Sequence, residues 1–241
     1  MSIITNLFGL PASFAGLDLP NATRRFDGVL HAHGARTIAV PDGMAYIEAG
    51  LGARAIATTM LEGERFGRAV LSHVRVAPFF ASVVLMVHPS PEVDAPLFLL
   101  DLHVIPVGRA RAYLDTCGPG VARPEFRANF WEPLRRSLGT SSALRSSPVP
   151  AWMAAFSGGC GAVVRARPGS ANRLVGLSEL YLEAYLRALA TAPAAKSVKE
   201  NERRAREVTA SLREHGRSGR MLNRAFGADI AARYTRVLYN D

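Results

Sequence analysis

A carboxylate and an imidazole stand two residues apart in an otherwise apolar segment, residues 97–105, which reads Leu-Phe-Leu-Leu-Asp-Leu-His-Val-Ile. These residue types are typical of a β-strand, and side chains on a strand alternate between its two faces. Asp101 and His103 are therefore predicted to point to the same face. A carboxylate among apolar residues is costly unless it is paired or protonated, and both conditions suit a proton donor. The alternative is a buried Asp–His or Asp–Arg pair with a purely structural role.

Charged side chains on two other strands are further candidates for chemistry. Arg165 closes the apolar run Gly-Ala-Val-Val-Arg at 161–165, and a guanidinium there can hold a carboxylate through two hydrogen bonds. His73 and Arg75 share one face of the segment 69–77 and are candidates for the same task. Each of the three could equally be an exposed or structurally paired residue that contacts no ligand.

Other kinds of site find little support. His31 and His33 are spaced as a metal pair, but no third ligand accompanies them. The glycine-rich stretch 158–161 lacks the spacing of a nucleotide-binding loop, and no GxSxG motif offers a serine nucleophile. Cys117 and Cys160 stand alone, without a CxxC pair. We therefore expect no bound metal and no bound cofactor.

The composition favours a folded protein with an acidic partner. Of the 241 residues, 49% are apolar, and 29 Lys and Arg outnumber 20 Asp and Glu, which gives a net charge of +9. Such a charge attracts nucleic acid, anionic membranes, acidic proteins or polyanionic small molecules, although an arginine-rich genome would produce the same balance. The most basic run, 196–220, carries four acids and no aromatic residue for stacking, which argues against nucleic-acid binding.

No segment has the roughly 18 uninterrupted apolar residues that a membrane span needs. The first twenty residues lack the basic region of a secretory signal. No internal repeat or long linker divides the chain. We expect a single domain, 1–241, that is a cytoplasmic monomer without membrane contact.

The patterning predicts consecutive strands followed by helices. Strands are expected at 69–77, 81–87, 97–105, 109–115 and 158–166. The third and fourth of these form a hairpin around the turn Pro-Val-Gly at 106–108. Helices are expected at 124–138, 177–188, 198–212, 221–226 and 230–238. The last two are hinged at Gly227, and the order of elements favours an antiparallel sheet with helical layers.

Three segments together resemble the ferredoxin-dependent bilin reductases, enzymes that reduce open-chain tetrapyrroles. The first is Pro-Leu-Phe-Leu-Leu-Asp at 96–101 followed by Ala-Tyr-Leu-Asp at 112–115. The second is Pro-Ala-Trp at 150–152 with Val-Arg at 164–165. The third is Leu-Asn-Arg-Ala-Phe-Gly at 222–227 with Ala-Ala-Arg-Tyr at 231–234 and Val-Leu-Tyr at 237–239. The resemblance covers residues 60–241. It implies a three-layer α/β/α sandwich with a central, mostly antiparallel sheet and a bilin pocket between sheet and C-terminal helices.

The resemblance also assigns roles. Asp101 falls on the family's catalytic aspartate, which protonates the bilin, and Arg165 falls on an arginine that grips a propionate. Arg217 falls on a basic residue near the propionates. Electrons would arrive singly from reduced ferredoxin, or flavodoxin, because the family carries no metal or flavin of its own. The implied enzyme is an oxidoreductase acting on CH–CH groups of a linear tetrapyrrole, biliverdin above all, with an acidic ferredoxin docked on a basic face.

The sequence departs from the family pattern at three positions. Val84 or a close neighbour stands where phycocyanobilin-forming members carry a histidine, Arg75 where they carry a glutamate, and Gly216 near where several carry an aspartate. His103 or His73 would then supply the missing group. We expect Asp101 and His103 to be catalytic, and the substrate-binding set to be Arg165, Arg217, Arg75 and His73. Two other functions stay open: an enzyme like red chlorophyll catabolite reductase, and a tetrapyrrole carrier without a proton relay.

Overall fold

A nine-stranded sheet forms the centre of the computed structural model, which describes residues 17–77, 80–105, 109–121, 123–157, 159–167, 169–215 and 218–239. Its order is β1-β3-β4-β5-β6-β7-β9-β8, with β2 also paired to β3, and every pairing is antiparallel. The strands are β1 (Arg36–Ile38), β2 (Tyr46–Ala49), β3 (Arg54–Glu62), β4 (Phe66–Val76), β5 (Phe80–Pro89), β6 (Leu97–Ile105), β7 (Arg109–Cys117), β8 (Leu144–Ser147) and β9 (Ala162–Ala166).

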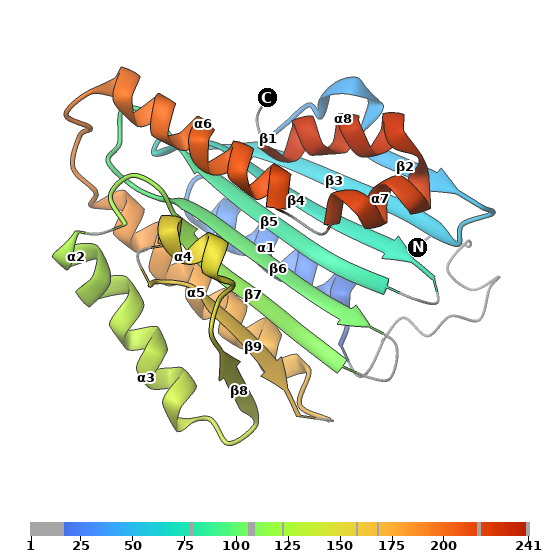
Figure 1. The fold of residues 1–241 in the computed structure, drawn as a ribbon, viewed down its shortest axis with the longest axis horizontal. Helices are drawn as coiled ribbons and strands as arrows, with labels where there is room; N and C mark the ends of the chain where they lie inside the picture. The colour runs from blue at the N-terminus through green and yellow to red at the C-terminus, as the bar shows by residue number, and fades with distance from the viewer. Residues whose placement is uncertain are drawn as a thin grey trace.

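The five strands β3 to β7 follow one another both along the chain and across the sheet (Figure 1). Each pairs with the next over most of its length, because their alternating Val, Leu, Ile and Phe side chains suit a pleated surface covered on both sides. β9 then returns beside β7, and the short β8 pairs outside β9. Residues far apart in sequence therefore lie in one row across the sheet.

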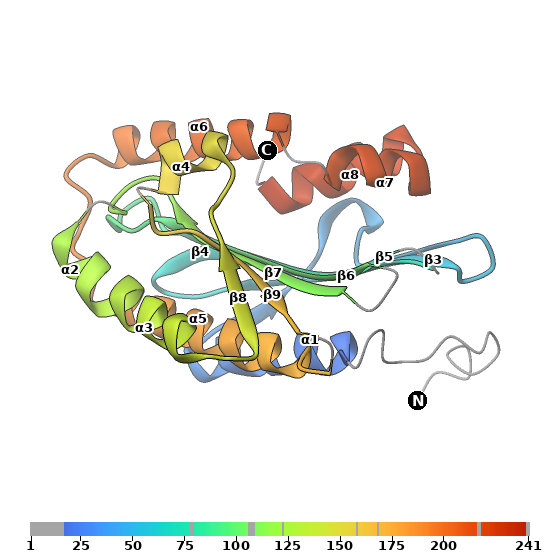
Figure 2. The ribbon, with the colours of Figure 1, turned by 60° about the horizontal axis from the view of Figure 1, so that its bottom comes forward.

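Helices cover both faces of the sheet, as Figure 2 shows edge-on. We call the first the α5 face. It carries α1 (Leu19–Ala32), α5 (Asn172–Ala190) and a helix that runs from α2 (Pro124–Phe126) through the π-turn η3 (Arg127–Trp131) into α3 (Glu132–Thr140). Its core is aromatic: the Phe98 ring lies 4.9 Å from that of Tyr185, and the Phe130 ring 4.8 Å from that of Tyr181. Such pairs add about 0.5–1.5 kcal/mol each beyond the burial of their area.

The opposite side, which we call the α8 face, carries α4 (Ala151–Ser157), α6 (Val198–His215), α7 (Ser218–Phe226) and α8 (Ala228–Tyr239) (Figures 1 and 2). Apolar side chains of these helices pack on Met60, Val70 and Met86 of the sheet. Gly227 separates α7 from α8 with a φ of 88°, a left-handed conformation that glycine adopts without strain. The α5 and α8 faces thus have separate hydrophobic cores.

The predicted three-layer sandwich with an antiparallel sheet is confirmed. The expected hairpin is present as β6 and β7, while its turn residues 106–108 lie outside the described residues. The helix expected at 124–138 ends at Thr140 and contains a π-turn. The strand expected at 158–166 begins only at Ala162, because Gly159 has a φ of 81° and the chain is still turning there. Among the described residues, no helix combines the length and the apolar character needed to cross a membrane.

Candidate active site

Asp101 and His103 lie next to each other on the α8 face of β6. Because side chains alternate along the strand, Leu100 and Leu102 between them enter the core of the α5 face, while the two polar side chains remain on the α8 face. Asp101 Oδ1 lies 3.4 Å from His103 Nδ1, and neither atom has a hydrogen-bond partner among the described residues. The Asp101 side chain is 33% exposed and that of His103 18% exposed. Both side chains are therefore partly exposed, although the two facing atoms themselves are buried.

The side chains around Asp101 come from neighbouring strands and from α8. Val84 of β5 is directly opposite on one side and Tyr113 of β7 on the other. Ser72 of β4 is the strand partner of Val84, and the buried side chain of Tyr234 of α8 lies close to Ser72. Burial raises the pKa of both tyrosine hydroxyls, and the nearby Asp101 carboxylate raises each further. Both phenols therefore stay protonated at neutral pH.

A row of arginines continues from His103 across the sheet. His103 pairs with Arg111 of β7, Arg111 with Arg165 of β9, and Arg165 with Arg145 of β8. All therefore share the α8 face, and this row contains no acidic residue. Like charges directly opposite one another on a sheet, such as those of Arg165 and Arg145, repel, so an anion bound beside these two would relieve that repulsion. The structure thus places the predicted Arg165 one strand beyond a cation that is itself opposite His103.

His73 and Arg75 are not brought together with Asp101. They pair with Ala57 and Ala55 of β3 in a register that sends both side chains to the α5 face. The Arg75 guanidinium donates a hydrogen bond of 2.6 Å to the Gly52 carbonyl. Burial, followed by the charge of Arg75, lowers the pKa of His73 to about 4. The structure therefore does not bring His73 and Arg75 together with Asp101, and their substrate-binding roles stay predictions.

The other residues that the sequence singled out are placed as follows. Arg217 and Gly216 lie outside the described residues. Cys117 and Cys160 are both buried and free. His33 and His31 each face an acid, Glu183 at 3.0 Å and Asp27 at 3.6 Å. Within the described residues, no three His, Cys, Asp or Glu side chains are grouped as metal ligands.

Comparison with known proteins decides the family. The sequence matches the family described as ferredoxin-dependent bilin reductase over residues 24–240. The chain belongs to the ferredoxin-dependent bilin reductases. The resemblance seen in the sequence is thereby confirmed, and the protein is an oxidoreductase of a family that draws its electrons from ferredoxin.

Solved structures agree with this bilin reductase fold. Phytochromobilin synthase from tomato, in complex with biliverdin, superposes with a TM-score of 0.73 at 12% identity, covering 92% of this chain and 82% of the other. A structure of PcyX gives a TM-score of 0.54 at 11% identity, covering 89% and 93%. At these identities the likeness concerns the fold. No curated protein matches the sequence.

This bilin reductase also contains a buried acid that the sequence reasoning left without a role. Asp115 of β7 is fully buried on the α8 face, opposite Leu99 and two residues from Tyr113. Its Oδ1 accepts a 2.8 Å hydrogen bond from the Thr116 amide. Burial raises the pKa of Asp115 to about 8, although the Thr116 amide and the Cys117 thiol partly oppose this. The signal in the sequence was an acid that follows the apolar residues of this strand, in the Ala-Tyr-Leu-Asp segment at 112–115.

The structure shows which side chains lie around Asp101 at the positions where the sequence departs from the family pattern. Val84 is directly opposite Asp101, so an aliphatic side chain occupies that place in the site. The β4 side chain beside Val84 is Ser72, not Arg75, which points to the other face. Among the described residues of the α8 face, His103 is therefore the imidazole nearest to Asp101.

Proposed function

We propose that this protein reduces a linear tetrapyrrole, with biliverdin as the substrate, using electrons from ferredoxin. The observation that carries the proposal is the Asp101–His103 pair, which is partly exposed on the α8 face and is followed by the arginine row. Family membership supports the reaction type, and the biliverdin bound to the tomato relative supports the substrate.

The reaction requires two electrons and two protons for each double bond. Each reduced ferredoxin gives one electron and is itself oxidised, so two encounters are needed. We assign the first proton to Asp101, which lies on the accessible face, and we assign to His103 the role of returning a proton to Asp101 from solvent. Tyr113 and Tyr234, which stay protonated, would exclude water at the edges of the site, where the Tyr113 hydroxyl donates a hydrogen bond to Met153 Sδ.

The arginine row would hold the carboxylates of the substrate. Biliverdin carries two propionates, and Arg165 and Arg145 are exposed cations on neighbouring strands. A planar guanidinium binds a carboxylate through two parallel hydrogen bonds. Because Arg111 lies between Arg165 and His103, propionates bound at this row would place the conjugated part of the tetrapyrrole toward Asp101.

An anaerobic assay with biliverdin, reduced ferredoxin and the purified protein tests the proposal. Loss of the biliverdin absorbance and a new product on chromatography are the expected results. Reduction of a chlorophyll-derived tetrapyrrole in preference to biliverdin would replace the substrate assignment. Tight binding of biliverdin with no reduction by any donor would make the protein a carrier and overturn the proposal.

A further inference from the structure

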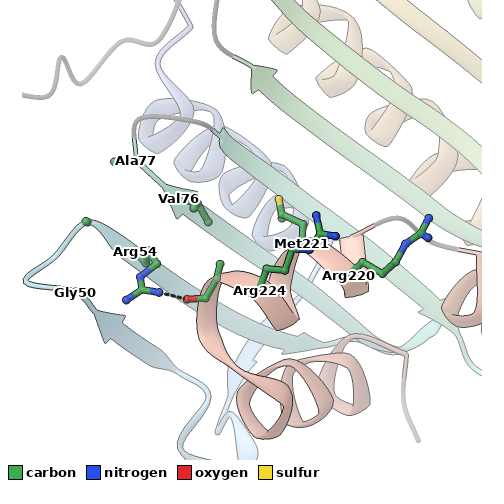
Figure 3. Close-up of a pocket in the computed structure, with 9 residues that line it drawn as sticks. Gly50, Arg54, Val76, Ala77, Arg220, Met221 and Arg224 are labelled. Atoms are coloured by element: carbon green, nitrogen blue, oxygen red, sulfur yellow. Dashed lines mark hydrogen bonds between the residues drawn. The ribbon is translucent and has the colours of Figure 1, made fainter.

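A second basic site lies on the α8 face, away from Asp101. A cavity of about 850 Å³ opens where the ends of β3 and β4 meet α7 (Figure 3). Three arginines line it: Arg54 from β3, and Arg220 and Arg224 from α7. Asp101, His103 and Arg165 are not part of its lining, so this cavity is separate from the proposed proton-transfer pair and from the arginine row.

The charges of this cavity are unbalanced. Arg54 is fixed by a 2.5 Å hydrogen bond from its guanidinium to the Ala225 carbonyl in the last turn of α7, drawn as the dashed line in Figure 3. Arg220 and Arg224 are exposed and stand four residues apart on the same helix, a spacing at which like charges repel. The described lining contains no acidic side chain. An anionic partner would therefore be stabilised here.

An exposed apolar side chain stands at the rim. Leu51 is 85% exposed and has a φ of 53°, and Gly50, which lines the cavity, and Gly52 also adopt left-handed conformations. A bulky residue in this region of backbone space is strained, and such strain is most often found where it serves a function. The β2–β3 turn thus presents one large exposed apolar side chain next in sequence to Gly50 of the basic cavity, and an apolar anchor with a charged rim is typical of protein interfaces.

The cavity connects to the Asp101–His103 pair through few residues. Val76 forms part of its wall and is paired with Phe80 on the adjacent strand. The Phe80 ring stacks on the imidazole of His103, with ring centres 6.0 Å apart and an angle of 29° between the planes. A protein docked over the cavity would therefore lie near the reacting groups without covering Asp101 itself.

We propose that this cavity and the Leu51 turn are the docking site of the acidic electron donor. The inference rests on the proposed function. The occupant is a small, acidic iron–sulfur protein whose carboxylates contact Arg220 and Arg224 and whose surface covers Leu51. In each encounter the reduced cluster loses one electron and the bound tetrapyrrole gains it, while Asp101 supplies the accompanying proton. Two encounters complete the two-electron, two-proton reduction.

The double variant Arg220→Glu/Arg224→Glu tests the site. The matched control is Arg135→Glu/Arg136→Glu on α3, which makes the same change of charge on exposed residues of the opposite layer (Figure 2). Binding of ferredoxin is measured by titration at low and high salt. Turnover is measured with ferredoxin and, separately, with a small viologen donor. Loss of steered association should raise the KM for ferredoxin about tenfold or more in the α7 variant and flatten its salt dependence.

The viologen-supported rate and the affinity for biliverdin should not fall in the α7 variant, and the α3 control should behave as the wild type. Leu51→Gly removes the anchor and the backbone strain together, so it should weaken ferredoxin binding while leaving thermal stability equal or higher. Equal ferredoxin affinity in the α7 variant, the control and the wild type would overturn the docking site. If no donor reduces biliverdin, the proposed function fails, and the binding titrations still decide the docking site.

Discussion

Asp101 Oδ1 and His103 Nδ1 face each other across 3.4 Å, both buried atoms of partly exposed side chains on a strand whose other side is fully buried. This distance is longer than an ordinary hydrogen bond, and both atoms lack another partner among the described residues. Catalytic contacts of this kind are often loose in the empty enzyme and shorten when substrate binds. We propose that the two groups act together as one proton-carrying unit.

Asp101→Asn should retain biliverdin binding and slow complete reduction about 100-fold or more, because the amide cannot donate a proton as an acid does. An electron would still arrive, so a one-electron-reduced tetrapyrrole radical should accumulate. Absorbance and electron paramagnetic resonance measure both effects. Asp229→Asn on α8 is the control, since Asp229 is exposed and ion-paired with Arg233. Turnover at the wild-type rate in Asp101→Asn would remove Asp101 from the mechanism.

His103→Gln should also slow the reduction, by less than Asp101→Asn does, because the glutamine still donates hydrogen bonds but cannot return a proton to Asp101. If the two residues act as a unit, the double variant should be no slower than Asp101→Asn alone. Single-turnover rates of the four proteins complete this cycle. Independent, multiplicative losses would show that His103 acts on its own.

Arg165→Ala should weaken biliverdin binding by one lost charge-assisted contact, on the order of 1.5–3 kcal/mol, which corresponds to roughly 10- to 100-fold in Kd. Arg173→Ala, an exposed arginine on α5, is the matched control and should leave the affinity unchanged. Arg165→Lys should recover part of the loss, because it retains the charge but not the planar geometry. Unchanged affinity in Arg165→Ala would exclude this residue from the substrate site.

The layers of the fold could be predicted from the sequence. Which of the candidate site residues lie together on one face of the sheet could not. Alternation within 97–105 places Asp101 and His103 on one face, and alternation within 69–77 does the same for His73 and Arg75. Which face each pair occupies depends on the register between strands, and a shift of one residue exchanges the faces. The observed pairing sends His73 and Arg75 to the α5 face.

The arginine row could not be predicted from the sequence for a related reason, because it also depends on how the strands pair. Arg111, Arg145 and Arg165 lie on β7, β8 and β9, whose order across the sheet, β7-β9-β8, differs from their order along the chain. No spacing along the chain indicates that these three side chains share one row. The family resemblance identified Arg165 alone, and only the topology adds its two neighbours.

Asp115 makes the stability of the protein depend on pH in a direction opposite to that of most acids. The pKa of its carboxyl group is about 8 in the folded protein, against 3.8 when it is exposed on unfolding. Between these values the folded state keeps a proton that the unfolded state has released. The stabilisation is therefore complete below about pH 4 and is lost as pH rises to about 8, a change on the order of 6 kcal/mol.

Two buried histidines make the stability of the protein depend on pH in the opposite direction to Asp115, because their contribution is lost as pH falls. Burial lowers the pKa of His73 and of His88 to about 4, so each contributes stability that is present above its unfolded value of 6.5 and is lost as pH falls through 4. A pH profile of the wild type alone would mix these contributions. Comparison with Asp115→Asn isolates the carboxyl group, because the asparagine oxygen can still accept the Thr116 amide hydrogen bond.

The free energy of unfolding of the wild type should therefore fall relative to that of Asp115→Asn as pH rises from 5 to 8. Urea unfolding at several pH values measures this difference, and Asp229→Asn serves again as the control with a constant difference. The variant should overtake the wild type toward pH 8, since no cation among the described residues acts on the Asp115 carboxylate to compensate its burial beside Gly161 and Cys117. A constant difference between wild type and Asp115→Asn would mean that Asp115 is already ionised in the folded protein at pH 5.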